Sequence, residues 1–275
     1  MSRLHLFEFE DLPWFPNALR ELMTDYLSFL GEKMQAPYHD VTERLHSAMV
    51  ACGQRRLVDL CTGGGGPAWT IASLLRQKHG YLVDLLLTDL YPNRARLQRL
   101  KDAATDSVDY CPDSIDATRV PPSISGFRLL CNGFHHFRKD QAQAILEDAV
   151  KQQQGIAIIE VLERSVPGFV QVLFLCGLPF LVTPFIRPFR LSRLFFTYVI
   201  PVVPLFILWD GMVSCLRIYS PAELEALVAS LSTTGESPPY EWEIGQTRVP
   251  WTPVPITYLI GYPPRSRSLR SPSTS

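Results

Sequence analysis

Four consecutive glycines, Gly63 to Gly66, stand directly behind an apolar run that ends in an acid, Asp59. The stretch reads L-V-D-L-C-T-G-G-G-G-P-A-W over residues 57–69. A glycine inside a regular element costs roughly 0.5–1 kcal/mol relative to alanine, so we expect these glycines where bare backbone is needed. A loop of this kind between a strand and a helix brings backbone N–H groups and the helix N-terminus to a ligand. The run therefore predicts a binding loop for a nucleotide-type cofactor.

Three further polar residues close later apolar runs. Asp89 ends L-V-D-L-L-L-T-D, Asn132 ends F-R-L-L-C-N, and Glu160 comes near the end of I-A-I-I-E-V. Short apolar runs that alternate with amphipathic stretches indicate βαβ units and a parallel sheet. Because the carboxyl ends of parallel strands lie at one edge of the sheet, we expect these side chains and Asp59 to line the same rim.

Two adjacent histidines, His135 and His136, follow Asn132 by three and four residues. Histidine can take a proton near neutral pH, so either one could act as a base if the reaction needs one. Local packing with Phe134 and Phe137 explains the pair equally well. The six cysteines are scattered without a C-x-x-C pair, so we expect neither a disulfide framework nor a metal site.

Residues typical of helix ends and the spacing of apolar residues indicate where the helices and strands that position these residues lie. Pro67 fits the first position of the helix after the glycines, and Gly80 fits its end. Ser220 is a plausible N-cap for a helix that begins at Pro221. Helical spacing is also expected over residues 15–34 and 38–52, and late strands over 240–244 and 256–262.

The 275-residue chain has a globular composition, 47% hydrophobic and 19% charged. A formal net charge of -1 gives no basic footprint, so nucleic acid is not an expected partner. The acidic beginning of the sequence lacks a long apolar core, so we expect no secretory signal and a cytoplasmic setting. We expect five parts: an N-terminal helical cover (1–54), a cofactor-binding core (55–163), an apolar insertion (164–216), the C-terminal part of the core (217–262) and a disordered tail (263–275).

Two classes of cofactor fit the glycine loop. The spacing Gly63-x-Gly65-x-x-Ala68 matches the loose dinucleotide pattern, and Asp89 could hold a ribose in either class. Asp59, directly before the loop, favours a ligand with a positively charged group. No Y-x-x-x-K motif accompanies the loop, which weakens the case for an NAD(P)-dependent oxidoreductase.

The order of motifs resembles class I S-adenosylmethionine-dependent methyltransferases. These motifs are apolar-D-L-x-x-G-x-G, an acid ending the second strand, and D-A before the fourth strand. The resemblance covers roughly residues 55–162 and resumes at 216–262, and the D-L-C-T-G-G-G-G-P variant is similar to a bacterial-type subgroup. Cys61 departs from the family pattern, which has its first glycine there. The resemblance implies an α/β, Rossmann-like fold with a mostly parallel seven-stranded sheet and N-terminal helices.

Carried over residue by residue, the resemblance implies a site for S-adenosyl-L-methionine. The methionine part of the cofactor would meet Asp59 and the backbone of Gly63, Gly64 and Gly65. Asp89 would accept the ribose hydroxyls, and Asp116 with the Ala117 backbone would meet the adenine. Asn132 and Gly133 would lie beside the sulfonium. The cofactor carries the activation in methyl transfer, so the protein mainly orients the acceptor. We predict a methyltransferase on this basis. An NAD(P)-dependent oxidoreductase and a methyltransferase-like binding protein without activity are the alternatives.

The expected insertion is unusually apolar. Residues 166–186 and 194–209 contain no charged side chain, and Arg187, Arg190 and Arg193 lie between them. The first run could cross a bilayer by length. However, prolines break it, the chain must return to finish the sheet, and a hairpin would carry the arginines to the far side. We therefore expect either a peripheral or re-entrant membrane contact at the cytoplasmic face, which we favour, or a lid or subunit contact.

An apolar insertion at this position suits a small or lipid-like hydrophobic acceptor. Asp210 is a lone acid at the end of the second apolar run. It could orient an acceptor hydroxyl or amine, or it could form an ion pair with Arg217. The sequence does not predict which acceptor is used or how many subunits assemble.

Overall fold

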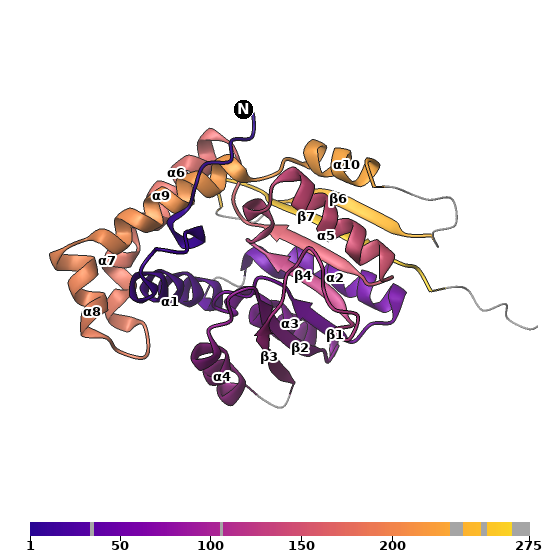
Figure 1. Cartoon of the computed structure of the whole chain (residues 1–275), viewed down its shortest axis with the longest axis horizontal. Coiled ribbons are helices and arrows are strands. Elements are labelled where there is room, and N and C mark those ends of the chain that lie inside the picture. The colour runs from indigo at the N-terminus through magenta and orange to yellow at the C-terminus, as the bar shows by residue number, and fades with distance from the viewer. Residues whose placement is uncertain (34–35, 105–106, 232–238, 249–251, 266–275) are drawn as a thin grey trace, which may run out of the picture.

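A seven-stranded sheet forms the centre of the computed structural model, which describes residues 1–33, 36–104, 107–231, 239–248 and 252–265 (Figure 1). The strand order is β3-β2-β1-β4-β5-β7-β6. The strands are β1 (Arg56–Asp59), β2 (Asp84–Asp89), β3 (Val108–Ser114), β4 (Phe127–Cys131), β5 (Ile156–Glu160), β6 (Glu241–Thr247) and β7 (Ile256–Tyr262). Strands β1 to β5 pair in parallel, and β7 runs antiparallel to both β5 and β6. The predicted mostly parallel seven-stranded sheet is confirmed.

Helices cover both faces of the sheet, as the unbroken apolar runs predict. Because successive side chains of a strand point to opposite faces, Leu57 of β1 joins one apolar core and Val58 joins the other. The first core is completed by α2 (His39–Cys52), α3 (Gly66–His79) and α4 (Arg94–Ala103). The second is completed by α5 (Lys139–Lys151) and α10 (Pro221–Ala229).

The predicted helix signals act as expected. In α3, Pro67 occupies the first turn, and Gly80 closes the helix in the left-handed region with φ at 61°. In α10, the Ser220 side chain and the Glu223 side chain form a reciprocal capping box. α10 therefore begins at Pro221 as predicted, whereas α3 begins at Gly66, one residue before the predicted Pro67.

A separate group of helices lies at one end of the molecule (Figure 1). It contains α1 (Asn17–Lys33), α6 (Val166–Gly177), α7 (Pro179–Val182), α8 (Leu191–Leu194) and α9 (Val202–Arg217), with short turns η4 (Thr183–Phe185) and η5 (Phe195–Val199). Tyr26 and Met23 of α1 and Val203 and Ile207 of α9 share a third apolar core. Gly211 lets α6 approach α9 closely, because an added Cβ would lie 2.8 Å from Val172. We call this group the helical region.

One stretch of the helical region, Val166–Phe185, is long and apolar enough to cross a membrane, with 20 residues and a hydropathy of 1.9. Leu191–Val199 and Val202–Arg217 pass the same test only as a pair, and they are bent by 75°. The broken helices expected from the prolines are therefore present. The predicted disordered tail falls mostly on residues 266–275, which lie outside the described residues.

Candidate active site

The glycine loop joins β1 to α3 at the carboxyl edge of the sheet. Gly63 and Gly65 both lie in the left-handed region, with φ of +48° and +76°. Glycine is the residue that adopts this conformation at little cost. A Cβ added to Gly63 would meet nothing within 4 Å, whereas one added to Gly65 would lie 2.6 Å from Leu100. Gly63 is therefore the glycine of this pair that leaves backbone open at the rim.

Gly64, unlike Gly63, is packed closely against a side chain of α1. A Cβ at this position would lie 1.7 Å from Oγ of Ser28 on α1. The carbonyl of Gly64 also accepts a hydrogen bond from Nε of Arg96 at 3.3 Å, and Arg96 pairs with Asp25 at 2.6 Å. The bare backbone of Gly64 thus serves the packing of α1 on the loop. Its predicted contact with a cofactor stays a prediction.

Asp89 ties the end of β2 to the loop. Its Oδ2 accepts the Gly63 N–H at 2.9 Å, and its Oδ1 accepts the Tyr91 N–H at 2.8 Å. An ionised carboxylate offers about four acceptor positions, so acceptor capacity remains for a ligand. Asp59, 3% exposed, lies at the end of the neighbouring strand β1. Burial, with a contribution from the charge of Asp89, raises the pKa of Asp59 to about 7.

The loops after β1 and β4 meet beside these carboxylates. Cys61 and Asn132 both have positive φ, 66° and 53°, and a Cβ on Gly133 would lie 3.4 Å from Cβ of Cys61. Strand order reverses between β1 and β4, which is where open α/β sheets bind ligands. The Asn132 side chain accepts from Val161 N–H at 3.0 Å and donates to the Tyr38 hydroxyl at 3.3 Å. Asn132 therefore holds the rim together.

Asp116 and Ala117 lie in the loop between β3 and β4. Asp116 is exposed, and its Oδ1 accepts both the N–H and the hydroxyl of Thr118 at 2.8 Å. Ala117 is 4% exposed and joins the apolar core beneath. The structure thus gives both residues a local role, and their predicted contact with adenine stays untested.

His135 lies in η3 (Phe134–His136), the turn after β4, and is 4% exposed. Glu160 at the end of β5 holds it twice: Oε1 accepts the His135 N–H at 3.1 Å, and Oε2 lies 2.9 Å from Nδ1. Because an ionised carboxylate only accepts, Nδ1 carries the proton in this pair. Nε2 is then the basic nitrogen of His135.

His136 has a different environment from that of His135. Its Nδ1 lies 2.9 Å from Oδ1 of Asp11, 3.6 Å from Glu8 and 3.4 Å from Nη1 of Arg217. Burial alone would lower the pKa of His136, but the hydrogen bond with Asp11 and the charges of Glu8 and Asp11 raise it to about 9. His136 is therefore protonated at neutral pH. The two histidines thus differ in their partners, Glu160 for His135 and Asp11 with Glu8 for His136, and the role of either one as a base stays a prediction.

Glu8, His135 and His136 also bring potential metal ligands within 4.8 Å of one another. The buried guanidinium of Arg217 already stands among them, 3.1 Å from Glu8 and 2.6 Å from Asp11. A metal ion at these three residues would face this fixed positive charge. We therefore assign the cluster to a network of ion pairs.

Asp210, 6% exposed, lies on α9 and serves the backbone of η1 (Phe9–Asp11). Its two oxygens accept the N–H groups of Phe9 at 2.7 Å and Glu10 at 3.2 Å. Burial raises the pKa of Asp210 to about 6. The ion pair considered between Asp210 and Arg217 does not occur among the described residues, where Arg217 pairs with Glu8 and Asp11.

Residues 3–11, which we call the N-terminal strap, cross over η3 and the end of α9. Arg3 donates to the carbonyls of His135 at 3.1 Å and Phe137 at 2.9 Å, and Leu4 N–H donates to the Leu216 carbonyl at 3.1 Å. The strap is not among the elements expected from the sequence. Its signal would have been the acidic stretch E-F-E-D at residues 8–11, which needs cationic partners once buried.

Among known proteins, the chain is similar to solved structures of methyltransferases. No family model and no curated protein matches the chain. A methyltransferase domain of the citrinin polyketide synthase is 13% identical, with a TM-score of 0.45 over 75% of this chain and 46% of that one. The plantazolicin methyltransferase, solved with S-adenosylhomocysteine, is 11% identical, with a TM-score of 0.49 over 89% and 95%. Human N-acetylserotonin methyltransferase, solved with S-adenosylmethionine, is 13% identical, with a TM-score of 0.45 over 85% and 54%.

This chain thus spans about half the length of the first and third of these proteins. All three TM-scores lie below 0.5. We therefore infer the function from the residues of the site and from the strand order.

Proposed function

We propose that this chain is an S-adenosylmethionine-dependent methyltransferase that acts on an apolar acceptor. The observation that carries the proposal is the bond between Gly63 N–H and Asp89 at the carboxyl edge of the sheet. It fixes an open turn of backbone beside a carboxylate with remaining acceptor capacity, next to the point where strand order reverses. This is the arrangement that a ribose-containing cofactor requires.

The remaining site residues fit the parts of this cofactor. Asp89 would accept the ribose hydroxyls, and the buried Asp59 would meet the ammonium group of the methionine part. Asp116 and the Ala117 backbone would meet the adenine, and Asn132 and Gly133 would lie beside the sulfonium. A cationic group next to Asp59 would reverse the unfavourable burial of its charge, which is the physical reason to place the ammonium there.

Strand order favours this cofactor over a dinucleotide. Dinucleotide-binding sheets of the doubly wound type run 3-2-1-4-5-6. Here β7 runs antiparallel between β5 and β6, which departs from that order. The acid before the glycine loop, Asp59, would repel a pyrophosphate and attract a sulfonium cofactor with its ammonium group.

The chain's own contribution to the chemistry centres on His135. The cofactor, when bound, supplies an electrophilic methyl group. Nε2 of His135 takes the proton that a hydroxyl or similar acceptor must lose as its oxygen forms the new bond. Glu160 keeps the proton on Nδ1 and stabilises the imidazolium that results. His136, already protonated, takes no proton, and Asp210 is assigned to holding the strap.

Calorimetric titration of the purified chain tests the proposal directly. S-adenosylmethionine and S-adenosylhomocysteine should bind, and a ligand at 100 times its dissociation constant should stabilise the fold by about 2.7 kcal/mol. Asp89→Ala should weaken binding at least about tenfold, since ribose hydroxyls then lose a charged acceptor. Asp102→Ala, an exposed acid on α4, is the matched control and should bind as the wild type does.

Two results would contradict the proposal. Binding of NADH or NADPH in preference to S-adenosylmethionine would make the chain an oxidoreductase candidate. Failure of the folded chain to bind any of the four would leave a methyltransferase-like scaffold without its cofactor.

A further inference from the structure

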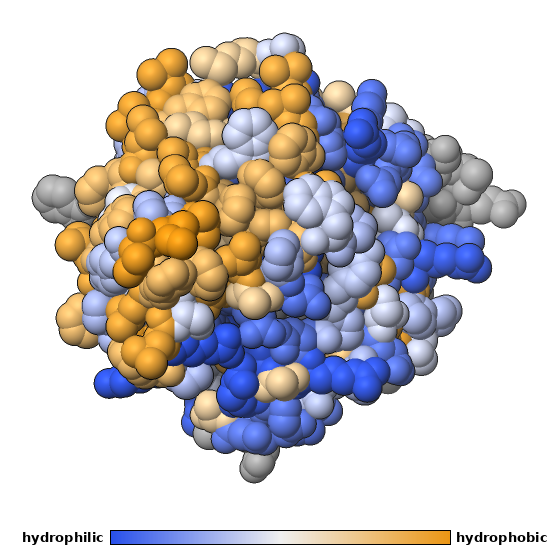
Figure 2. Space-filling view, turned by 60° about the vertical axis from the view of Figure 1, so that its left-hand side comes forward, coloured by the Kyte–Doolittle hydropathy of each residue, from blue (hydrophilic) through white to orange (hydrophobic). Residues whose placement is uncertain are grey.

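The helical region exposes large apolar side chains across one face (Figure 2). Six of them are at least 64% exposed: Val166, Phe174, Leu181, Phe185, Leu191 and Val199. We call this surface the apolar face. Scattered apolar residues are normal on a protein surface, but a contiguous apolar patch marks a site of interaction.

The side chains of the apolar face are not buried by other parts of this chain. In the stretch Val166–Phe185 only 22% of the most apolar window is buried, although α6 already packs on α9. The core of the helical region is formed by other side chains, such as Met23, Tyr26 and Ile207. The exposed apolar side chains are not part of this core, so we expect them to contact a partner.

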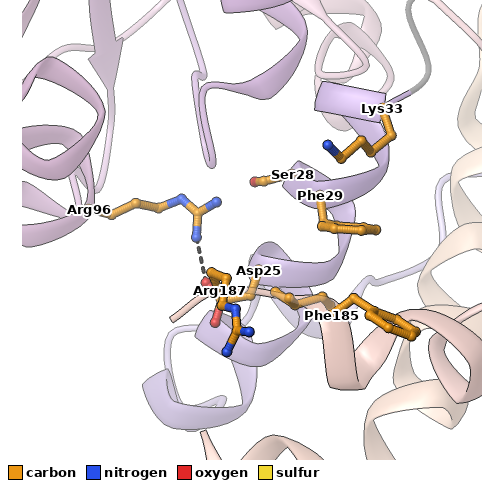
Figure 3. Close-up of a pocket in the computed structure, with 8 residues that line it drawn as sticks. Asp25, Ser28, Phe29, Lys33, Arg96, Phe185 and Arg187 are labelled. Carbon is orange, nitrogen blue, oxygen red and sulfur yellow. Dashed lines mark hydrogen bonds and ion pairs between the residues drawn. The ribbon is translucent and has the colours of Figure 1, made fainter. Parts of the chain in front are cut away.

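A cationic cleft of ≈ 240 Å³ adjoins the apolar face (Figure 3). Lys33, Arg96 and Arg187 line it, and among its described lining side chains Asp25 is the one acid. Asp25 is already shared, because Arg96 bonds to Oδ1 and Arg193 to Oδ2. Among the described side chains, Lys33 and Arg187 form no ion pair and both are exposed, so the cleft has an excess of positive charge.

Phe185 joins the two features. It lines the cleft together with Arg187, and it is 69% exposed at the edge of the apolar face. Apolar side chains bordered by cations are the combination by which a protein lies on an anionic membrane surface. Prolines and the 75° bend within the region suit helices that lie in the interface better than helices that cross it.

We propose that the apolar face docks onto an anionic phospholipid surface and that the cleft receives a lipid phosphate headgroup. Phe174, Leu181 and Phe185 enter the boundary between headgroups and acyl chains. Lys33 and Arg187 meet the phosphate. Ser28 lies between the cleft and Gly64, so docking places the glycine loop close to the level of the headgroups.

A second copy of the chain is a poorer occupant of the same face. In a two-fold dimer the same surface meets itself. Each copy would bring the same exposed cations, Lys33 and Arg187, to the contact. Charge complementarity therefore favours the lipid surface, and the proposal does not depend on the proposed methyl transfer.

Vesicle flotation with the full chain tests this proposal. The wild type should bind vesicles of phosphatidylcholine with phosphatidylglycerol at least about tenfold better than phosphatidylcholine alone, and high salt should weaken that preference. Lys33→Glu with Arg187→Glu should abolish the preference. Phe174→Ser with Leu181→Ser should weaken binding to both kinds of vesicle.

Matched controls lie away from the helical region. Leu82→Ser removes an apolar side chain that is 57% exposed, and Lys139→Glu reverses an exposed charge on α5. Both should bind vesicles as the wild type does. Thermal denaturation checks that each variant folds, and Arg187→Gln, a milder change, should reduce the preference in the same direction.

Three results would overturn the proposal. One is absence of vesicle binding by the folded wild type. Another is a dimer, seen by light scattering, that the Phe174→Ser, Leu181→Ser variant dissociates. The third is saturable binding of inorganic phosphate, lost in the charge-reversal variant, without any preference for anionic vesicles. That outcome would make the cleft a site for a soluble anion.

Discussion

Similar apolar sequences are buried in the sheet but largely exposed in the helical region. β5, with the sequence IAIIE, is buried at every position. α6, with the sequence VPGFVQVLFLCG, buries only Gly168 and Val172. The sheet has helices on both faces, whereas α6 has the protein on one side only. Apolar composition therefore predicts burial only where the fold supplies neighbours on every side, and elsewhere it predicts a partner.

The largest expected effect separates the two regions by stability. Phe127→Ala in β4 should lower the free energy of unfolding by about 3–5 kcal/mol, because a fully buried ring leaves a cavity. Phe174→Ala on the apolar face should change it by within about 0.5 kcal/mol. Urea denaturation measures both. A large loss from Phe174→Ala would show that the apolar face is part of the core after all.

The network that joins the two regions gives the next effect. Arg217→Leu should destabilise the chain by about 3 kcal/mol, because Glu8, 2% exposed, would lose the nearer of its two cationic neighbours, Arg217 at 3.1 Å and His136 at 3.6 Å. Arg138→Leu, an exposed arginine beside the same turn, should have little effect. Equal losses in the two variants, again by urea denaturation, would show that the buried pairing adds nothing.

The raised pKa of His136, about 9, predicts a dependence of stability on pH. A group whose pKa is higher in the folded chain stabilises it fully below the unfolded value, near 6.5, and loses that effect as pH rises through 9. The free energy of unfolding should therefore fall between pH 6.5 and 9. His136→Gln should flatten this part of the profile, measured by thermal denaturation across that range. An unchanged slope would mean that His136 is not the group responsible.

The smallest effect concerns Asp59 and the proposed cofactor. Its pKa of about 7 means that the free chain must release a proton before the carboxylate can meet an ammonium group. S-adenosylhomocysteine should accordingly bind about tenfold more tightly at pH 8 than at pH 6. Asp59→Asn should remove most of this dependence in calorimetric titrations. Affinity that does not vary with pH would place the ammonium elsewhere.

The sequence could predict the parts of the fold that are signalled locally. The apolar runs located β1, β2, β4 and β5, and proline and glycine marked the ends of α3. β3 lies at the sheet edge, and its sequence VDYCPDS carries little apolar pattern, so it was not located. An edge strand has one neighbour in the sheet and more contact with water, which explains its polar sequence.

Some residues of the candidate site could likewise be predicted from local sequence, whereas others could not. Motif spacing alone pointed to the glycine loop and to Asp89, whose bond with Gly63 the structure shows. The separate environments of His135 and His136 depend on Glu160 and on the N-terminal strap. The contact of Ser28 with Gly64 depends on where α1 packs. Such pairings join distant parts of the chain, and no local pattern encodes them.

The N-terminal strap has a consequence for the order in which the molecule assembles. Its contacts reach across almost the whole chain: Arg217 bonds to the Leu6 carbonyl, 211 positions away. Contacts of such high sequence separation are slow to form, and during synthesis they must await the later segment. The strap cannot take its place until α9 has been made. His136 gains its partners Asp11 and Arg217 only afterwards, so the ionic half of the site is completed last.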